Sequence, residues 1–164
     1  VESLVSLARP ETYRWHLGQG GPVLETVERA LSATKTTALR DRRIDELSGG
    51  ERARAFLARS LACDAAILLV DEPFASLDPH HQIQMMDIFK QEAANGRTIV
   101  IVLHDLNLAR FLCDQLYLLN DGEVVSFGAP ADVLSTKTLE TVYDIPVHID
   151  LYGHIHLFGM DKLS

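Results

Sequence analysis

Two acidic side chains follow a strongly apolar segment near the middle of the sequence. Asp71 and Glu72 come directly after Ile67–Val70, a run that predicts a parallel strand buried on both faces. In open α/β sheets, ligands bind at the carboxyl ends of such strands. A carboxylate such as Asp71 suits Mg²⁺ that accompanies nucleotide phosphates, and a second one such as Glu72 can polarise an attacking water. Two acids that simply leave a strand for a loop give the same pattern, so both interpretations stay open.

A pair of glycines precedes this strand, at the start of an expected helix. In Leu47-Ser48-Gly49-Gly50-Glu51 the glycines let backbone N–H groups approach a ligand, and the beginning of a helix favours an anion. Ser48 and Glu51 also have the spacing of a capping box, which needs no ligand. The segment can serve both purposes.

Further polar groups follow the same order along the chain. Ser76-Leu77-Asp78 comes just after the acidic pair, and His104-Asp105 ends the next predicted strand. His104 alone is more typical of a core or capping histidine, so its interpretation depends on the other motifs.

The elements that must position these groups alternate between helices and strands. Asp78-Pro79 predicts the start of a helix that runs to Asn95-Gly96, and Asn120-Asp121-Gly122 predicts a hairpin turn. The remaining elements are expected as helices at 23–31, 51–62, 131–134 and 139–143 and near 105, a strand at 98–103, and hairpin strands at 115–119, 123–127, 147–151 and 154–158. This order predicts an α/β domain with a largely parallel sheet.

Composition excludes several classes of protein. The 164 residues carry 15 Lys+Arg and 23 Asp+Glu, a formal charge of 15 − 23 = −8, which argues against autonomous nucleic-acid binding. Cys63 and Cys113 lack the spacing of a disulfide framework or a zinc site, as expected in a reducing compartment. No apolar run is long enough to span a membrane, and the first residues do not form a signal peptide.

Together the motifs resemble those of the ATP-binding cassette (ABC) ATPases that drive membrane transporters. Leu47–Glu51 matches the family's signature motif, Ile67–Glu72 its Walker B, Ser76–Asp78 its D-loop and His104 its switch histidine, in the family's order. The resemblance implies a P-loop NTPase-like ABC ATPase fold, truncated to a helical subdomain, residues 1–62, and the distal half of the mainly parallel catalytic core, residues 63–164.

The resemblance also implies roles for the residues of one ATP site. Asp71 would help to hold Mg²⁺, Glu72 would be the general base or water-orienting carboxylate, and His104 would contact the γ-phosphate of ATP. Positioned charges and donors of this kind are what phosphoryl transfer requires.

A second group of residues would act on the ATP of the opposite subunit. Ser48, Gly49 and Gly50 would grip its γ-phosphate, with Glu51 completing this nucleotide-binding segment, and Asp78 would couple the two sites. The implied partners are a homodimer or second ATPase subunit, transmembrane permease subunits and, indirectly, a periplasmic or surface substrate-binding protein. The implied location is the cytoplasmic side of the cell membrane, as a peripheral protein.

Finer resemblance points to one group of importers. Ala8-Arg9-Pro10, the run Leu103–Ala109 and the run Val142–Val147 look like importer ATPases for iron-siderophore, haem and cobalamin complexes. Cassette proteins of DNA repair or translation share the signature, but the acidic charge and the importer-like Leu103–Ala109 run disfavour them.

The sequence departs from the family at the phosphate-binding loop. It contains no G-x-x-x-x-G-K-[ST], and Lys35-Thr36 lacks the preceding glycines, which predicts ordinary helix or loop surface. Gln19, within its glycine-rich loop, is not the family's glutamine loop. The polypeptide alone is therefore predicted to have weak or absent ATPase activity. The alternative interpretation is a non-catalytic, truncated cassette that acts as a dimerisation or interaction module.

Two other groups of residues invite an interpretation. His154-x-His156, with His148 nearby, has a spacing compatible with a metal pair, although sheet histidines without a metal are the default. Trp15 is expected either to pack in the helical subdomain or to lie where a membrane subunit docks, and His80-His81 is expected at the surface or at a dimer rim.

Overall fold

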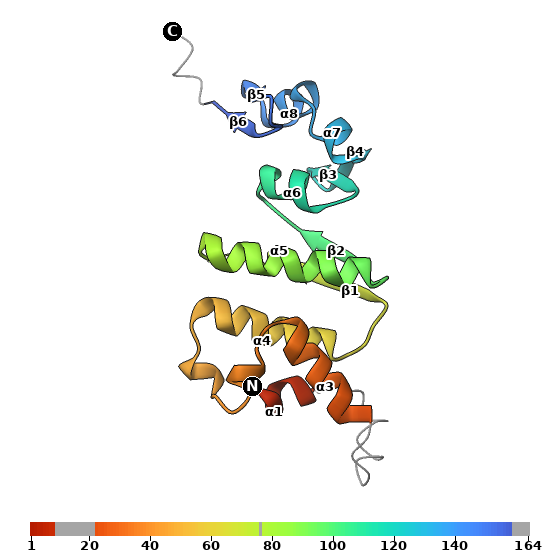
Figure 1. Ribbon diagram of the computed structural model, residues 1–164. Coiled ribbons are helices and arrows are strands. Elements are labelled where there is room, and N and C mark those ends of the chain that lie inside the picture. Colours follow the sequence, from red (N-terminus) through yellow and green to blue (C-terminus); the bar gives the residue numbers. More distant parts are fainter. Residues whose placement is uncertain (9–21, 76, 159–164) are drawn as a thin grey trace. The chain divides into compact units, whose positions relative to one another are not determined.

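The computed structural model describes residues 1–8, 22–75 and 77–158 and divides the chain into two compact units, Val1–Val102 and Leu103–Ser164 (Figure 1). The predicted mixture of helices and strands is confirmed. The boundary between subdomains at residue 62 stays a prediction, because the two units are defined by compactness alone.

Helices dominate the first unit. Its elements are α1 (Glu2–Ser6), α3 (Pro22–Ala33), the 3-10 helices η1 (Thr37–Leu39) and η2 (Ile44–Glu46), α4 (Gly49–Leu61), β1 (Ile67–Asp71), α5 (Pro79–Ala94) and β2 (Thr98–Val102). Helices α1, α3 and α4 pack together around Val5, Leu31 and Ala58, each of which is fully buried. The apolar faces of three short helices thus form one core.

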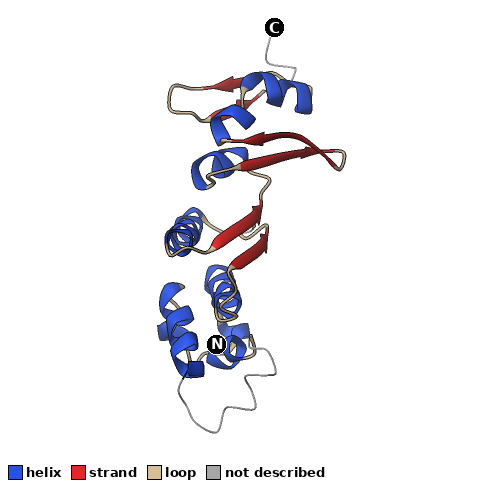
Figure 2. Ribbon diagram, turned by 90° about the vertical axis from the view of Figure 1, so that its right-hand side faces the viewer, coloured by secondary structure: helices blue, strands red, loops and turns tan. Residues whose placement is uncertain are grey.

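A parallel strand pair completes the first unit. β1 pairs with β2 in the register Ile67↔Thr98 to Asp71↔Val102, and α5 lies along one side of the pair (Figure 2). The buried residues Met85 and Phe89 of α5 belong to this side, where Phe89 meets the ring of Phe74 edge to face at 5.8 Å.

The expectation that the first strand is buried on both faces is wrong for the described structure. Leu68 is buried, but Ile67 and Leu69 are 59% and 75% exposed, as are Val100 and Val102 of β2 at 51% and 50%. In the described residues α5 covers one face of this pair, and nothing covers the other.

The second unit consists of two hairpins with short helices. Its elements are α6 (Leu106–Leu112), β3 (Leu116–Asn120), β4 (Glu123–Gly128), α7 (Pro130–Val133), α8 (Thr136–Tyr143), β5 (Val147–Ile149) and β6 (Ile155–Leu157). The predicted turn between β3 and β4 is confirmed, since Asp121 and Gly122 both have positive φ angles, 48° and 81°, as a two-residue hairpin turn requires. The core of this unit is a cluster formed by Val133, Leu134, Leu139, Val147 and Ile155.

Candidate functional site

The segment Ser48–Glu51 forms the capping box that its sequence predicts. Ser48 Oγ accepts a hydrogen bond from the Glu51 amide at 3.3 Å, and Glu51 Oε2 accepts one from the Ser48 amide at 2.9 Å. The hydrogen bond from the Ser48 backbone and the one with its hydroxyl lower the pKa of Glu51 below its usual value. Glu51 therefore serves α4 as a cap.

Capping leaves part of this segment able to bind an anion. The bond from the Glu51 amide uses a lone pair of Ser48 Oγ, while the hydroxyl hydrogen is shared with the Glu51 carboxylate and would turn from it to reach a phosphate. The amides of Gly49 and Gly50 belong to the first turn of α4, where N–H groups have no acceptor within the helix. Ser48 and Gly49 are exposed, whereas Gly50 is buried. A hydroxyl and two amides of this kind can receive a phosphate oxygen.

The acidic pair lies at the carboxyl end of β1, as predicted. Asp71 ends the strand, and Glu72 turns the chain with a left-handed φ of 45°, held by a 3.1 Å hydrogen bond from its amide to the Val102 carbonyl oxygen. Both side chains are exposed. An exposed carboxylate at the end of a parallel strand is a suitable ligand for Mg²⁺, so Asp71 fits the proposed ion.

Asp78 is the N-cap of α5, as the Asp-Pro pair predicts. Its Oδ1 accepts from the His81 amide at 2.9 Å, and its Oδ2 lies 2.7 Å from His81 Nδ1. The bond from the His81 backbone, followed by the one from its ring, lowers the pKa of Asp78. The described part of the D-loop thus includes a carboxylate that is already engaged at a helix start.

His104 belongs to the second unit and is exposed, immediately before Asp105, the N-cap of α6. Asp105 Oδ1 accepts from the Leu108 amide at 3.0 Å. This cap fixes the chain direction directly after His104. The role of His104 at a phosphate stays a prediction.

Sequence reasoning missed the function of Asn107 in the run that follows the histidine. Its Oδ1 accepts from the Ile155 amide at 2.7 Å and its Nδ2 donates to the Ile155 carbonyl oxygen at 3.1 Å. The side chain therefore acts like a neighbouring strand and ties α6 to β6. Nothing in the local sequence could reveal this contact, because its partner lies 48 residues away.

Replacing Asn107 by Ala is expected to destabilise the second unit by about 1–3 kcal/mol, because the Ile155 amide and carbonyl both lose their partner. Amide hydrogen exchange at Ile155 measures the effect directly. Asn107→Asp retains the acceptor but not the donor, so its loss should be smaller. Equal effects of the two variants would contradict this account.

The pair Lys35-Thr36 offers no phosphate site. Lys35 is exposed in the turn after α3, as predicted, but Thr36 is buried rather than at the surface, with its hydroxyl 2.8 Å from that of Thr34. Arg9-Pro10, Trp15, Gln19 and Ser76 lie outside the described residues.

The tail histidines surround a carboxylate. Asp150 Oδ2 lies 3.4 Å from both His154 Nδ1 and His156 Nε2, and the rings of His148 and His156 are 6.2 Å apart. No group of three or more His, Cys, Asp or Glu side chains in the described part of the chain is arranged to hold a metal ion. In the structure these residues are hairpin histidines, two of which contact the Asp150 carboxylate.

Asp150 makes this hairpin sensitive to acid. Hydrogen bonds from the amides of His154 and Tyr152, both 2.9 Å, and contacts with His156 and His154 lower its pKa from 3.8 to about 2. A lowered carboxyl pKa stabilises the folded state above the unfolded pKa, and this contribution disappears as the pH falls from 3.8 toward 2. Thermal unfolding between pH 5 and pH 2 (roughly the span of a carboxyl titration) should show a smaller pH dependence in Asp150→Asn. Identical profiles would contradict the assignment.

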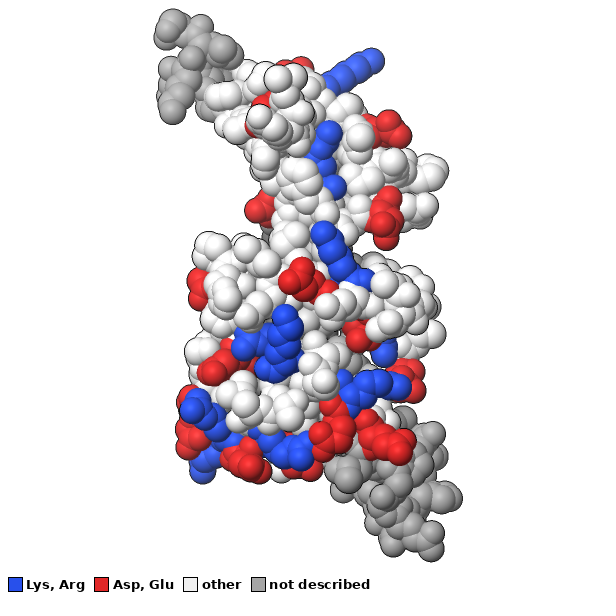
Figure 3. All heavy atoms as spheres, in the orientation of Figure 1, with Lys and Arg blue, Asp and Glu red and all other residues white. Residues whose placement is uncertain are grey.

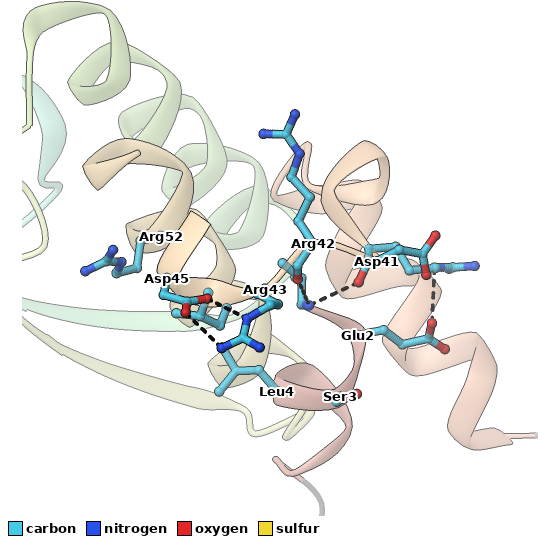
Figure 4. A pocket seen from close by; sticks show the side chains of 11 residues that line it. Glu2, Ser3, Leu4, Asp41, Arg42, Arg43, Asp45 and Arg52 are labelled. Atoms are coloured by element: carbon cyan, nitrogen blue, oxygen red, sulfur yellow. Dashed lines mark hydrogen bonds and ion pairs between the residues drawn. The ribbon is translucent and has the colours of Figure 1, made fainter. Parts of the chain in front are cut away.

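A cavity of about 740 Å³ lies beside the N-terminal helix of the first unit (Figure 4). Arg43 and Asp45 face each other on its wall, with Nη2 and Oδ2 2.9 Å apart, and the terminal amine of Val1 donates to the carbonyl oxygens of Arg40 and Arg42. Basic and acidic side chains are interspersed on the face of this unit shown in Figure 3.

Comparison with known proteins identifies the family. The sequence pattern of the family described as ABC transporter matches residues 8–75. The hemin import ATP-binding protein HmuV of Thermobifida fusca (strain YX) is 48% identical over 120 residues, which cover 73% of this chain and 42% of that protein. The achromobactin transport ATP-binding protein CbrD of Dickeya dadantii (strain 3937) is 36% identical over 168 residues, 99% of this chain and 62% of that protein. The chain belongs to the ABC transporter ATP-binding family.

A solved structure of an ABC transporter ATPase has a similar fold. The ADP conformation of an ATP-binding cassette of an ABC transporter superposes with a TM-score of 0.69 at 25% identity, over 77% of this chain and 51% of that one. Two predictions are thereby confirmed: the family resemblance inferred from the motifs, and the ABC ATPase fold. The chain spans 42% and 62% of the two relatives' lengths, so the residue roles within an ATP-binding cassette stay predictions.

Proposed function

We propose that this chain is part of the ATP-hydrolysing subunit of an ABC importer that takes up a metal chelate of the iron-siderophore, haem or cobalamin type. The observation that carries the proposal is the ordered set of motifs from Leu47 to His104 in a chain whose relatives are named hemin and achromobactin transport ATP-binding proteins.

The chemistry proposed for one site uses residues at the ends of the two strands. Bound Mg²⁺, held in part by Asp71, would supply positive charge to the phosphates. The carboxylate of Glu72 would orient a water and accept its proton as the water attacks the γ-phosphorus of ATP. The bond from that phosphorus to the β-phosphate oxygen would break and ADP would leave, while His104 would donate a hydrogen bond to a γ-phosphate oxygen.

The opposite site would receive a different surface of the chain. The Ser48 hydroxyl and the amides of Gly49 and Gly50, at the positive end of α4, would hold the γ-phosphate of ATP bound to the second subunit. Asp78 would lie at the contact between the subunits. Transmembrane permease subunits and, indirectly, a periplasmic or surface substrate-binding protein would complete the proposed importer, with this chain bound at the cytoplasmic side of the membrane. Among the described residues, no helix has the length and apolarity that a membrane crossing demands.

Uptake measurements test the substrate class. Disrupting the gene should abolish uptake of one labelled chelate among ferric siderophores, haem and cobalamin, while uptake of amino acids and sugars continues. Loss of sugar or amino-acid uptake with normal chelate uptake would overturn the proposal.

A second candidate function rests on the exposed face of the strand pair. Ile67, Leu69, Val100 and Val102 present apolar surface that favours pairing with another chain, and the 164 residues contain no phosphate-binding loop. A non-catalytic cassette that pairs with complete subunits would fit both facts. The intact mass of the native protein separates the candidates, because a mass well above 18.2 kDa supports the catalytic subunit and a mass equal to it supports the interaction module.

A further inference from the structure

The two glycines at the start of α4 have different surroundings. A methyl group built on Gly49 would meet nothing within 4 Å, whereas one built on Gly50 would overlap Cγ and Cδ2 of His81 and come within 2.7 Å of its Nε2. Gly50 therefore needs to be glycine because the His81 ring of the same chain lies against it, whereas no contact within the described chain requires glycine at position 49.

The His81 ring is fixed from the other side by Asp78. That carboxylate accepts the His81 amide at 2.9 Å with one oxygen and meets ring Nδ1 at 2.7 Å with the other. Because one carboxylate holds both the backbone and the ring, the ring cannot leave Gly50 without breaking a hydrogen bond at the N-cap of α5. The side chain of His81 is 23% exposed, so the contact is largely shielded from water.

A neighbouring contact joins the same two helices. Arg54 of α4, which is 8% exposed, donates from Nη1 to Gln84 Oε1 at 2.8 Å, and Gln84 Nε2 lies 2.8 Å from His80 Nε2. The N-terminal halves of α4 and α5 are thus held together by two sets of contacts. The His81 contact is the one that touches the glycine segment.

We propose that His81 is a positioning residue for the Ser48–Gly50 segment. Its ring occupies the space beside Gly50 and, held by Asp78, sets the first turn of α4 against the first turn of α5. The inference rests on the proposed function only in treating Ser48–Gly50 as the segment that grips phosphate. The His81 ring links the Ser48–Gly50 segment to Asp78 within one subunit. A displacement of either one should therefore displace the other.

An exchange of side-chain size tests the contact on the full 164-residue chain. Gly50→Ala should lower the folding equilibrium constant, measured by urea unfolding, by about tenfold. The overlap of the new methyl group with the His81 ring should destabilise the fold by more than the higher helix propensity of Ala stabilises it. Removing the ring should restore the space, so Gly50→Ala combined with His81→Ala should lose clearly less than the product of the two single losses.

Gly49→Ala is the matched control, since it gains the same methyl group in open space. It should show no coupling to His81→Ala. Equal effects of Gly49→Ala and Gly50→Ala, or independent effects of Gly50→Ala and His81→Ala, would overturn the proposal. Because this measurement involves no nucleotide, its failure leaves the proposed ATPase function untouched.

A local readout separates positioning from general stability. His81→Asn keeps a side-chain donor for Asp78 but lacks the ring. In His81→Asn we expect hydrogen exchange at the amides of Glu51 and Arg52 to be about tenfold faster than in the unsubstituted chain, when each rate is normalised to that of the Ala62 amide at the far end of α4. His81→Phe keeps a ring beside Gly50 but loses the Nδ1 contact with Asp78, so it should restore slow exchange at these two amides only in part. Uniformly faster exchange along α4 in both variants would indicate a structural role only and would overturn the proposal.

Discussion

Replacing Glu72 by Gln is expected to lower the rate of ATP hydrolysis by about 10²–10⁴-fold, the usual contribution of a general base. Gln has nearly the same shape but cannot accept the proton of the attacking water. Asp71 and the Ser48–Gly50 segment are unchanged, so ATP should still bind with similar affinity. Phosphate release and nucleotide binding should be measured with an ATPase in which residues 1–164 are joined to, or paired with, a polypeptide that contains a phosphate-binding loop. We call this assembly the complete ATPase.

Two comparisons make this prediction specific. Glu123→Gln removes an exposed carboxylate from β4 and should leave turnover unchanged. The 164-residue polypeptide alone, which has no phosphate-binding loop in its sequence, should show little or no turnover in any variant. Substantial hydrolysis by Glu72→Gln in the complete ATPase would exclude the carboxylate as the base.

The position of Glu72 was predictable from sequence because local rules govern it. An apolar run followed by two acids indicates where a strand ends, and Asp78-Pro79 indicates where α5 begins. Both signals act within a few residues, and the structure agrees with both. The turn at Asp121-Gly122 was predictable for the same reason, since few residues adopt its positive φ angles without strain.

Features that depend on distant residues were not predictable in this way. The run Ile67–Val70 indicates apolar side chains but not what covers them, and Leu69 is 75% exposed in the described structure. The histidine pair after Asp78 was expected at a surface or dimer rim, yet the ring of His81 packs against Gly50, a residue of another helix. Asn107 likewise bonds to a strand far along the chain. Periodicity and turn chemistry say nothing about such pairings.

Replacing Ser48 by Asp should separate the two interpretations of the glycine segment. Asp is as good an N-cap as Ser and its charge suits the start of a helix, so the free energy of unfolding should change by less than about 1 kcal/mol. The same carboxylate would stand beside a γ-phosphate, and we expect ATP hydrolysis to fall by at least about 10²-fold, as when a preorganised donor is lost. Urea unfolding and phosphate release measure the two effects.

Ser135 provides a matched control for the substitution at Ser48. It caps α8 in the same manner, accepting from the Thr138 amide at 3.3 Å, at a helix to which we assign no phosphate. Ser135→Asp should leave both stability and hydrolysis nearly unchanged. If Ser48→Asp is equally harmless, Ser48 is a cap and nothing more, and the resemblance to the signature motif carries no function here. If stability is retained and hydrolysis is lost, the hydroxyl that caps α4 through its lone pair also serves the phosphate through its hydrogen.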